Sequence, residues 1–390
     1  MSITSRLLFV GCLLLGIAEA DAAPPKLAIV APAAVGLQAD KLAEIEVVVT
    51  EAIAADKLPG CVIAIGRDSR LAYLRAFGNR AIEPEPVLMT TDTVFDLASL
   101  TKPISTATSV LLLVERGQLK LTDKVAQHLP EFGAEGKDVV TVEQLLIHQG
   151  GLIADNKLAD YQDGFELGWQ RVCALKPLSV PGTKFVYSDV GFIVLGELVK
   201  RVGTKPLDEF AKSEIFEPLG MSETGYRPAD SLKIRAAPTQ KRNDEWMRGD
   251  VHDPRAFLMG GVAGHAGLFS TAEDLARYAA MMANGGEYSG VRVLSRDTCQ
   301  QMIEARMVST GKRALGWDVR TGFSTNRGET MSERAFGHGG FTGTAIWIDP
   351  ETKLFVIFLS NRVHPNGKGL VNPLAGKVGS IAAGAIEAQP

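Results

Sequence analysis

The segments that predict β-strands lie near the two ends of the chain, and this placement constrains the fold more than any other feature. Near the N-terminus, an apolar run at 61–65, a turn at 66–70 and a second run at 71–77 predict a β-hairpin. Towards the C-terminus, alternating or apolar runs predict strands at 315–321, 335–340, 344–349 and 354–360. We therefore expect one antiparallel sheet built from both ends of the chain.

The segment between these strands is dominated by helical patterns. Apolar spacing and capping signals predict helices at 99–116, 142–148, 189–201 and 271–282, and further helices at 39–55 and 374–386 flank the strands. Helices outside a mostly antiparallel sheet indicate the α+β class. Within one domain, 38–386, residues 38–98 and 287–386 would form the α/β part and 99–286 a mainly helical subdomain. The irregular stretch 225–264 is long enough to suggest a functional loop.

The first 22 residues are expected to be a secretory signal and not part of the fold. Arg6 precedes an apolar run at 7–18, and Ala-x-Ala sites follow it, which is the pattern of an export signal. The run is too short for a stable membrane span. More leucines follow Cys12, which disfavours a lipoprotein. Residues 23–37 predict a linker, so we expect a secreted or periplasmic protein.

Charge and metal-ligand content exclude several classes of function. The 41 Lys and Arg residues against 45 Asp and Glu give a net charge of −4, which offers no basic surface for nucleic acid. Cys61, Cys173 and Cys299 do not make a disulfide framework. The six histidines have no zinc spacing, and no nucleotide-binding loop occurs. We expect neither a metal nor a cofactor, and the oligomeric state stays open.

Ser99 and Lys102 are the first candidates for catalysis. Residues three apart on a helix share one face, so the lysine amine would lie beside the serine hydroxyl. A serine becomes a useful nucleophile when a nearby base accepts its proton, and a partly desolvated lysine can do so. The alternative is an N-capping serine and a solvated lysine, because this spacing alone is common.

Two further motifs strengthen the catalytic interpretation. Tyr187 and Asp189 stand two residues apart at the entrance of a predicted helix. His338 begins the glycine-rich run that continues through Gly340 to Phe341, on what we expect to be an edge strand. Glycines there would let a ligand approach backbone N–H groups closely.

These motifs, in this order, resemble the serine β-lactamase and penicillin-binding-protein superfamily. The likeness spans residues 38–386 and is nearest to class C β-lactamases, type 4B D-alanyl-D-alanine carboxypeptidases and family VIII esterases. The supporting runs are FDLASLTK at 95–102, LLIHQGGL at 145–152, FEPLGM at 216–221 and GVAGHAGLFST at 261–271. The resemblance implies a β-lactamase/DD-peptidase-like α+β fold, with an antiparallel sheet flanked by helices beside the helical subdomain.

The resemblance also implies roles for the motif residues. Ser99 would be the acylated nucleophile, Lys102 its general base, and Tyr187 a second proton-transfer group. The backbone N–H groups of Ser99 and Phe341 would form the oxyanion hole. Asp189 stands where the family usually has Asn, and it should favour the protonated form of Lys102.

Other departures and candidates bear on the substrate. His338 stands where many members have Lys, and Gly339 where they have Thr or Ser, so a fixed positive charge is weakened. Arg255 and Arg362 are candidates for holding a substrate carboxylate through a bidentate pair. His148 and His265 are interpreted as packing residues, because neither has a partner motif.

The sequence thus predicts a secreted serine hydrolase that forms an acyl-enzyme. Cell-wall peptides ending in D-Ala-D-Ala are the favoured substrate, with a β-lactam or a small ester as alternatives. A non-catalytic peptidoglycan-binding or penicillin-binding module is the alternative from a different class. Intact Ser99, Lys102 and Tyr187 argue against that module, because turnover needs a nucleophile with a base in reach.

Overall fold

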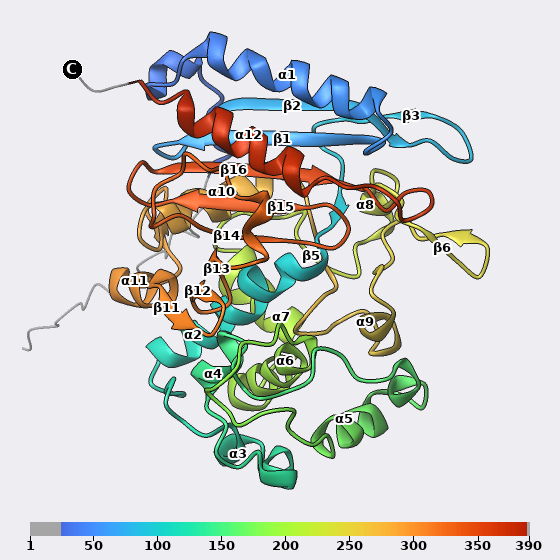
Figure 1. Ribbon diagram of the computed structural model, residues 1–390, viewed down its shortest axis with the longest axis vertical. Helices are drawn as coiled ribbons and strands as arrows, with labels where there is room; N and C mark the ends of the chain where they lie inside the picture. The colour runs from blue at the N-terminus through green and yellow to red at the C-terminus, as the bar shows by residue number, and fades with distance from the viewer. Residues whose placement is uncertain (1–24, 388–390) are drawn as a thin grey trace, which may run out of the picture.

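The computed structural model describes residues 25–387, and its central element is an antiparallel sheet that joins both ends of the chain (Figure 1). The sheet has nine strands in the order β11-β12-β13-β14-β15-β16-β1-β2-β3. Their bounds are β1 Gly60–Arg67, β2 Arg70–Ala81, β3 Val87–Leu88, β11 Arg306–Val308, β12 Gly311–Arg313, β13 Asp318–Arg320, β14 Phe336–Gly339, β15 Ala345–Asp349 and β16 Leu354–Ser360. The expected pairing of the two ends is confirmed, since β1 pairs with β16 from Cys61↔Ser360 to Arg67↔Leu354.

Two expectations about the sheet are wrong. The short strands β11 and β12 were missed, because three-residue strands rich in Arg and Lys carry no apolar alternation. β14 is not an edge strand, since it lies between β13 and β15. However, β14 pairs with β13 only at Asp318↔Gly337. His338 and Gly339 therefore lie beyond the β13 pairing and face an open edge.

Apolar side chains alternate between the two faces of the sheet, and each face packs on helices. α1 (Ala39–Ala54) and α12 (Asn372–Gly384) cover one face, where the core includes Ile63 and Val356. α10 (Ala272–Ala283) covers the other face, where Val62 and Ile357 join the larger core. Figure 1 shows α1 and α12 on the outer side of the sheet and the helical part on the opposite side. The α+β class is confirmed.

The helical part follows the predicted elements closely at their starts. Thr141 and Thr271 cap their helices, accepting from the backbone N–H of Gln144 at 3.3 Å and of Asp274 at 3.4 Å. The helices here are α2 Thr108–Glu115, α3 Val125–His128, α4 Val142–Leu146, α5 Phe165–Cys173, α6 Asp189–Gly203, α7 Leu207–Ala211, α8 Asp230–Lys233 and α9 Pro254–Leu258, and α11 Arg296–Ile303 follows α10. Short strands add β4 Phe95–Asp96, β5 Gly225–Tyr226 and β8 Leu268–Ser270 in one small sheet, with the pairs β6 Lys241–Arg242 and β7 Glu245–Trp246, and β9 Glu287–Tyr288 and β10 Val291–Arg292.

The single helix expected at 99–116 is instead three segments. A 3₁₀ turn, η2 (Ala98–Leu100), precedes a π-helical stretch, η3 (Lys102–Ala107), and α2 follows. Pro103 has no N–H to give to an α-helical hydrogen bond, so the regular ladder cannot run through this position. π-Helical turns are frequent at functional sites, and this one begins at Lys102. The remaining 3₁₀ or π segments are η1 Pro32–Val35, η4 Pro130–Gly136, η5 Leu158–Tyr161, η6 Lys212–Phe216 and η7 Ser324–Asn326.

Residues 25–37, which were expected to form a linker, pack against the domain. Leu27, Val35 and Leu37 are buried, and Ile29 bridges to Leu71 in β2. The predicted signal at 1–22, with Cys12, lies outside the described residues. From residue 25 to 387, no helix is both long and apolar enough to cross a membrane. Cys61, Cys173 and Cys299 are buried free thiols, as a core role predicts.

Candidate active site

A cavity of about 650 Å³ between the sheet and the helical part gathers the predicted motif residues. Ser99, Tyr187 and Asp189 line it from the helical side, and His338, Gly340 and Phe341 line it from β14 and the turn after it. Lys102 lies beneath Ser99 and is fully buried. The structure therefore brings the predicted motif residues to one place. A cavity of this size accommodates a small molecule or a short peptide.

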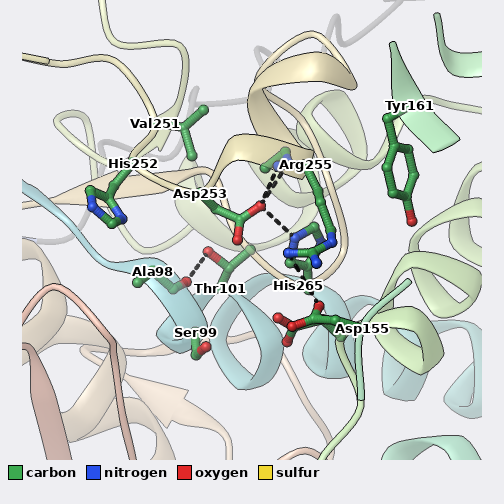
Figure 2. A network of polar contacts seen from close by, with 12 residues as sticks. Ala98, Ser99, Thr101, Asp155, Tyr161, Val251, His252, Asp253, Arg255 and His265 are labelled. Carbon is green, nitrogen blue, oxygen red and sulfur yellow. Dashed lines mark hydrogen bonds and ion pairs between the residues drawn. The ribbon is translucent and has the colours of Figure 1, made fainter. Parts of the chain in front are cut away.

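The turn that carries Ser99 is held in an unusual backbone conformation. Ala98 has a φ of +46°, which is uncommon for a residue with a side chain. The buried Asp96 carboxylate accepts from the Ala98 N–H at 2.8 Å and from the His252 N–H at 2.6 Å. The Thr101 hydroxyl donates to the Ala98 carbonyl at 2.7 Å, as Figure 2 shows. These bonds stabilise a strained conformation of the kind often found at functional sites.

Lys102 donates two hydrogen bonds and forms one ion pair with neighbouring groups. Nζ lies 3.0 Å from Ser99 Oγ, 3.0 Å from the His265 carbonyl oxygen and 2.6 Å from Asp189 Oδ1. An ammonium group has three donors and no acceptor, so two acceptors and a carboxylate around Nζ suit the protonated lysine. Burial lowers the Lys102 pKa, but the Asp189 carboxylate and the Tyr187 hydroxyl outweigh it and raise the pKa above its usual value. The resting lysine is thus an ammonium paired with Asp189.

Tyr187 lies between aromatic rings beside this lysine. Its ring stacks on Phe323, with centroids 4.9 Å apart, and packs against His148 at 4.5 Å. Lys102 Nζ is 4.9 Å from the ring centroid. The Tyr187 hydroxyl is buried and makes no hydrogen bond with any residue in 25–387. It is therefore free to bond a substrate or a water in the cavity.

His148 serves the packing role expected of it. Its Nδ1 accepts from the Ser188 N–H at 3.0 Å, and Phe192 packs on its ring. Burial and the nearby cations Arg313 and Lys102 hold its pKa well below the usual value, so the imidazole is neutral. His148 thus orients the segment that carries Tyr187 without adding charge.

The glycine-rich segment after β14 packs directly on the nucleophile turn. A Cβ at Gly340 would overlap with Thr344 Oγ1 and lie 2.5 Å from the Leu97 carbonyl oxygen, so only glycine fits. The Thr342 and Thr344 hydroxyls donate to the carbonyls of Asp96 and Leu97 at 2.7 and 3.1 Å. This close approach places Phe341 at the cavity wall with Ser99.

A polar network adjoins Ser99 on the side of the 252–265 loop (Figure 2). Asp253 Oδ1 lies 2.9 Å from His265 Nε2 and also caps α9 by accepting from two backbone N–H groups. Asp189, Asp253 and His265 present ligand atoms within 4.8 Å of one another. The Lys102 ammonium is already paired with Asp189, so a cation added there would compete with the lysine for this carboxylate and be repelled by it. This trio does not change the expectation of a metal-free site.

The two arginine candidates differ in where the structure places them. Arg255 donates to the Asn156 carbonyl at 2.8 and 3.1 Å, lies 3.5 Å from Asp155 and does not line the cavity. Arg362 does line the cavity, although Nε and Nη1 donate to the carbonyls of Phe341 and Gly369. Arg362 is therefore the better candidate for meeting a carboxylate.

Several residues of the site were not identified from the sequence. Asp96 and Asp253 bond backbone N–H groups across separate segments, and Arg313 lies fully buried 3.5 Å from Asp318. Asn326 lines the cavity from η7. The position of Asp96 three residues before Ser99 was a usable signal. The segment 251–253, which contains Asp253, resembles the type 4B relatives and was also a usable signal. Arg313 and Asn326 depend on contacts between segments far apart in the chain, which no local pattern reveals.

The site consists of a serine hydroxyl hydrogen-bonded to a buried lysine, in a cavity beside an antiparallel sheet. This arrangement defines a serine hydrolase of the acyl-enzyme type. The family model described as Beta-lactamase matches residues 45–378. An N-acetylmuramyl-L-alanine amidase from Bacillus subtilis (strain 168) is 32% identical, over 83% of this chain and 81% of that protein. A protein from Escherichia coli O157:H7, whose name assigns it to the D-alanyl-D-alanine carboxypeptidases, is 30% identical over 92% and 91%.

The fold of this chain also matches that of a protein whose structure has been solved. A penicillin-binding protein homologue from Caulobacter crescentus superimposes with a TM-score of 0.73, over 90% of this chain and 99% of that one, at 23% identity. The chain therefore belongs to the β-lactamase family and is a serine hydrolase. The resemblance expected from the motifs is confirmed.

The contact between Lys102 and Asp189 predicts a change in pH dependence. In Asp189→Asn the carboxylate that raises the Lys102 pKa is gone, so the free amine should form at lower pH. Each unit of decrease raises the free-amine fraction at neutral pH about tenfold. The measurement is the pH profile of acylation by penicillin or an activated ester, with Lys102→Ala as the inactive control. Loss of activity in Asp189→Asn would mean that Asp189 itself carries the proton.

The Asp96 carboxyl predicts an acid limb in the same profile. Burial raises its pKa to about 6, with a further rise from Asp253, while the N–H groups of His252 and Ala98 oppose the rise. Below that pH the protonated carboxyl turns an O–H towards a backbone N–H, which should loosen the Ser99 turn. We expect kcat/KM to fall below about pH 6, and Asp96→Asn to be slower at neutral pH, by about tenfold, without this limb. An unchanged limb in Asp96→Asn would contradict the assignment.

Proposed function

We propose that this enzyme hydrolyses D-Ala-D-Ala-type amide bonds in cell-wall peptides through an acyl-enzyme on Ser99. The observation that carries the proposal is the 3.0 Å contact between Ser99 Oγ and Lys102 Nζ, at the floor of a cavity large enough for a short peptide. The names of the two relatives support a cell-wall substrate. The proposal therefore requires that the enzyme binds a cell-wall peptide as its substrate.

Acylation would begin when the Ser99 oxygen attacks the carbonyl carbon of the scissile bond. Lys102 can accept the serine proton once it has passed one of its own to Asp189, which is 2.6 Å away. The backbone N–H groups of Ser99 and Phe341 would stabilise the oxyanion. The C–N bond then breaks, and the leaving amine takes a proton from Tyr187, whose hydroxyl has no protein partner among the described residues.

Deacylation would reverse these roles. A water attacks the ester carbonyl, its proton passes to the same pair of groups, and the Ser99 oxygen recovers a proton as the acid product leaves. Tyr187 and Lys102 both lie next to the ester position, so either can assist the water. In this proposal the chain's own residues supply each proton transfer of the cycle.

An amidase acting between a sugar acid and L-alanine is a second candidate. The relative from Bacillus subtilis carries that name. Three exposed apolar side chains, Phe323, Phe341 and Leu370, line the cavity here. Aromatic faces at the opening of a cavity suit the apolar face of a sugar ring. A β-lactam or a small ester stays an alternative, whereas the contact between Ser99 and Lys102 disfavours a non-catalytic module.

A substrate panel tests the proposal. The purified enzyme is given an N-acyl-D-Ala-D-Ala peptide, an N-acetylmuramyl-L-alanine peptide, nitrocefin and p-nitrophenyl butyrate, and kcat/KM is measured for each. We expect the D-Ala-D-Ala peptide to give the highest value. Ser99→Ala should abolish turnover and labelling by fluorescent penicillin, because the attacking oxygen is missing. Faster cleavage of another substrate would replace the proposed one, and labelling that survives in Ser99→Ala would overturn the nucleophile.

We also propose that the protein is exported. The N-terminal pattern of Arg6, the apolar run at 7–18 and the Ala-x-Ala sites supports this, and a cell-wall substrate requires it. N-terminal sequencing of the protein from the extracellular or periplasmic fraction should begin between residues 21 and 24. An intact Met1 or a lipid on Cys12 would contradict the proposal.

A further inference from the structure

The turn after β14 has little conformational restraint of its own, although it carries a proposed oxyanion donor. Gly339, Gly340 and Gly343 surround Phe341 in the sequence, and glycine is the residue with the greatest backbone freedom. The Phe341 side chain is 60% exposed. The Thr342 hydroxyl ties the turn to a neighbouring segment but does not contact Phe341. Because an oxyanion donor has to be in place before the reaction begins, contacts from outside the turn are needed to hold Phe341.

Arg362, two residues after the end of β16, makes these contacts. Its Nε donates to the Phe341 carbonyl oxygen at 2.9 Å, and its guanidinium carbon lies 4.6 Å from the centroid of the Phe341 ring. Its Nη1 donates to the Gly369 carbonyl oxygen at 2.8 Å. A planar guanidinium can bond a carbonyl and lie over an aromatic ring at the same time. Arg362 thus connects both the backbone and the side chain of Phe341 to the end of a central strand.

The surroundings of Arg362 leave its side chain little freedom. Gly343 has a φ of +109°, and a Cβ there would lie 2.8 Å from Arg362 Cγ. A Cβ at Gly369 would lie 2.8 Å from Arg362 Cβ. The arginine stem therefore occupies space that two glycines leave open. The His252 ring also stacks on Phe341, with centroids 5.5 Å apart and planes 25° apart, so the exposed Phe341 ring is held by two neighbours.

The hydrogen bonds of the turn leave one donor unused at the cavity wall. The Phe341 carbonyl accepts from Arg362, whereas the Phe341 N–H donates to no other residue in 25–387. The Gly340 carbonyl, which shares a peptide group with that N–H, accepts from the Gly343 N–H at 3.0 Å. Phe341 lines the same cavity as Ser99. An N–H that is fixed by its neighbours but has no partner of its own is what stabilisation of an oxyanion requires.

We propose that Arg362 is a positioning residue that holds the Phe341 N–H in place for the oxyanion formed during attack by Ser99. This inference rests on the proposed function and deepens it, because it names the residue that keeps the glycine-rich turn in its active conformation. Arg362 acts through Phe341 and does not contact the reacting atoms. Without it, the turn samples other conformations, and the transition state loses one of its two N–H donors for part of the time.

The test compares p-nitrophenyl butyrate with its thiono ester, in which sulfur replaces the carbonyl oxygen. Neither ester carries a carboxylate, so a role of Arg362 in meeting a carboxylate cannot produce the effect. Complete loss of an oxyanion donor costs about 10²–10³ in rate, and we expect Arg362→Ala to lower kcat/KM for the oxygen ester by about tenfold. Sulfur accepts hydrogen bonds less well than oxygen. The thiono ester should therefore lose less, and the ratio of the two kcat/KM values should fall about fivefold.

Two further variants complete the experiment. Arg362→Lys keeps one donor for the Phe341 carbonyl and should give an intermediate ratio, which keeps the inference testable if Arg362→Ala does not fold. Arg292→Ala is the matched control. Arg292 also donates to two backbone carbonyls, those of Gly285 and Leu294 at 3.0 and 3.1 Å, but does not line the cavity. This variant should keep the wild-type values for both esters.

The outcomes separate the inference from the proposed function. An unchanged kcat/KM for the oxygen ester in Arg362→Ala would overturn the inference, and so would an equal loss for the two esters, which would indicate a general structural effect. If the ratio falls as expected but the D-Ala-D-Ala peptide is not cleaved, the inference stands and the proposed substrate fails. If ester hydrolysis survives in Ser99→Ala, both the nucleophile and the inference are wrong.

Discussion

The buried ammonium of Lys102 is the interaction on which the rest of the site depends. It contacts Ser99 in the 3₁₀ turn η2, the His265 carbonyl from the 252–265 loop and the Asp189 carboxylate at the start of α6. A charge without solvent is costly unless it is fully paired, so these three segments must meet at one point. The same pairing that stabilises the site holds the lysine protonated, so the proposed acylation begins with a proton shift along the Lys102–Asp189 contact.

A second set of contacts joins the sheet to the nucleophile. Asp96 bonds the backbone on both sides of the cavity floor, and the Thr342 and Thr344 hydroxyls bind the turn before Ser99. Ser99 and Phe341, the proposed donors of an oxyanion hole, come from positions more than two hundred residues apart. The side-chain bonds to backbone carbonyls hold their two segments together, and the absence of a side chain at Gly340 permits this contact.

The departures from the family motifs are consistent with one another. Asp189 replaces a neutral residue and pairs with Lys102, His338 replaces a lysine and is neutral, and Gly339 makes room for Asn326. Each departure thus changes the charge or the space beside Lys102 and β14, and none of them adds a positive charge to the cavity.

The sequence by itself determined the α+β class, the pairing of the two chain ends, the capped helices at Thr141 and Thr271, and the motif residues Ser99, Lys102, Tyr187, Asp189 and His338. These follow from short-range patterns, since periodicity, capping and motif spacing are properties of neighbouring residues. Only the tertiary structure decided the interior position of β14, the π-helical break at Pro103 and the position of the Asn326 amide beside Gly339. These features arise from contacts between distant segments, where packing space and unpaired hydrogen-bonding groups become defined only after the chain has folded.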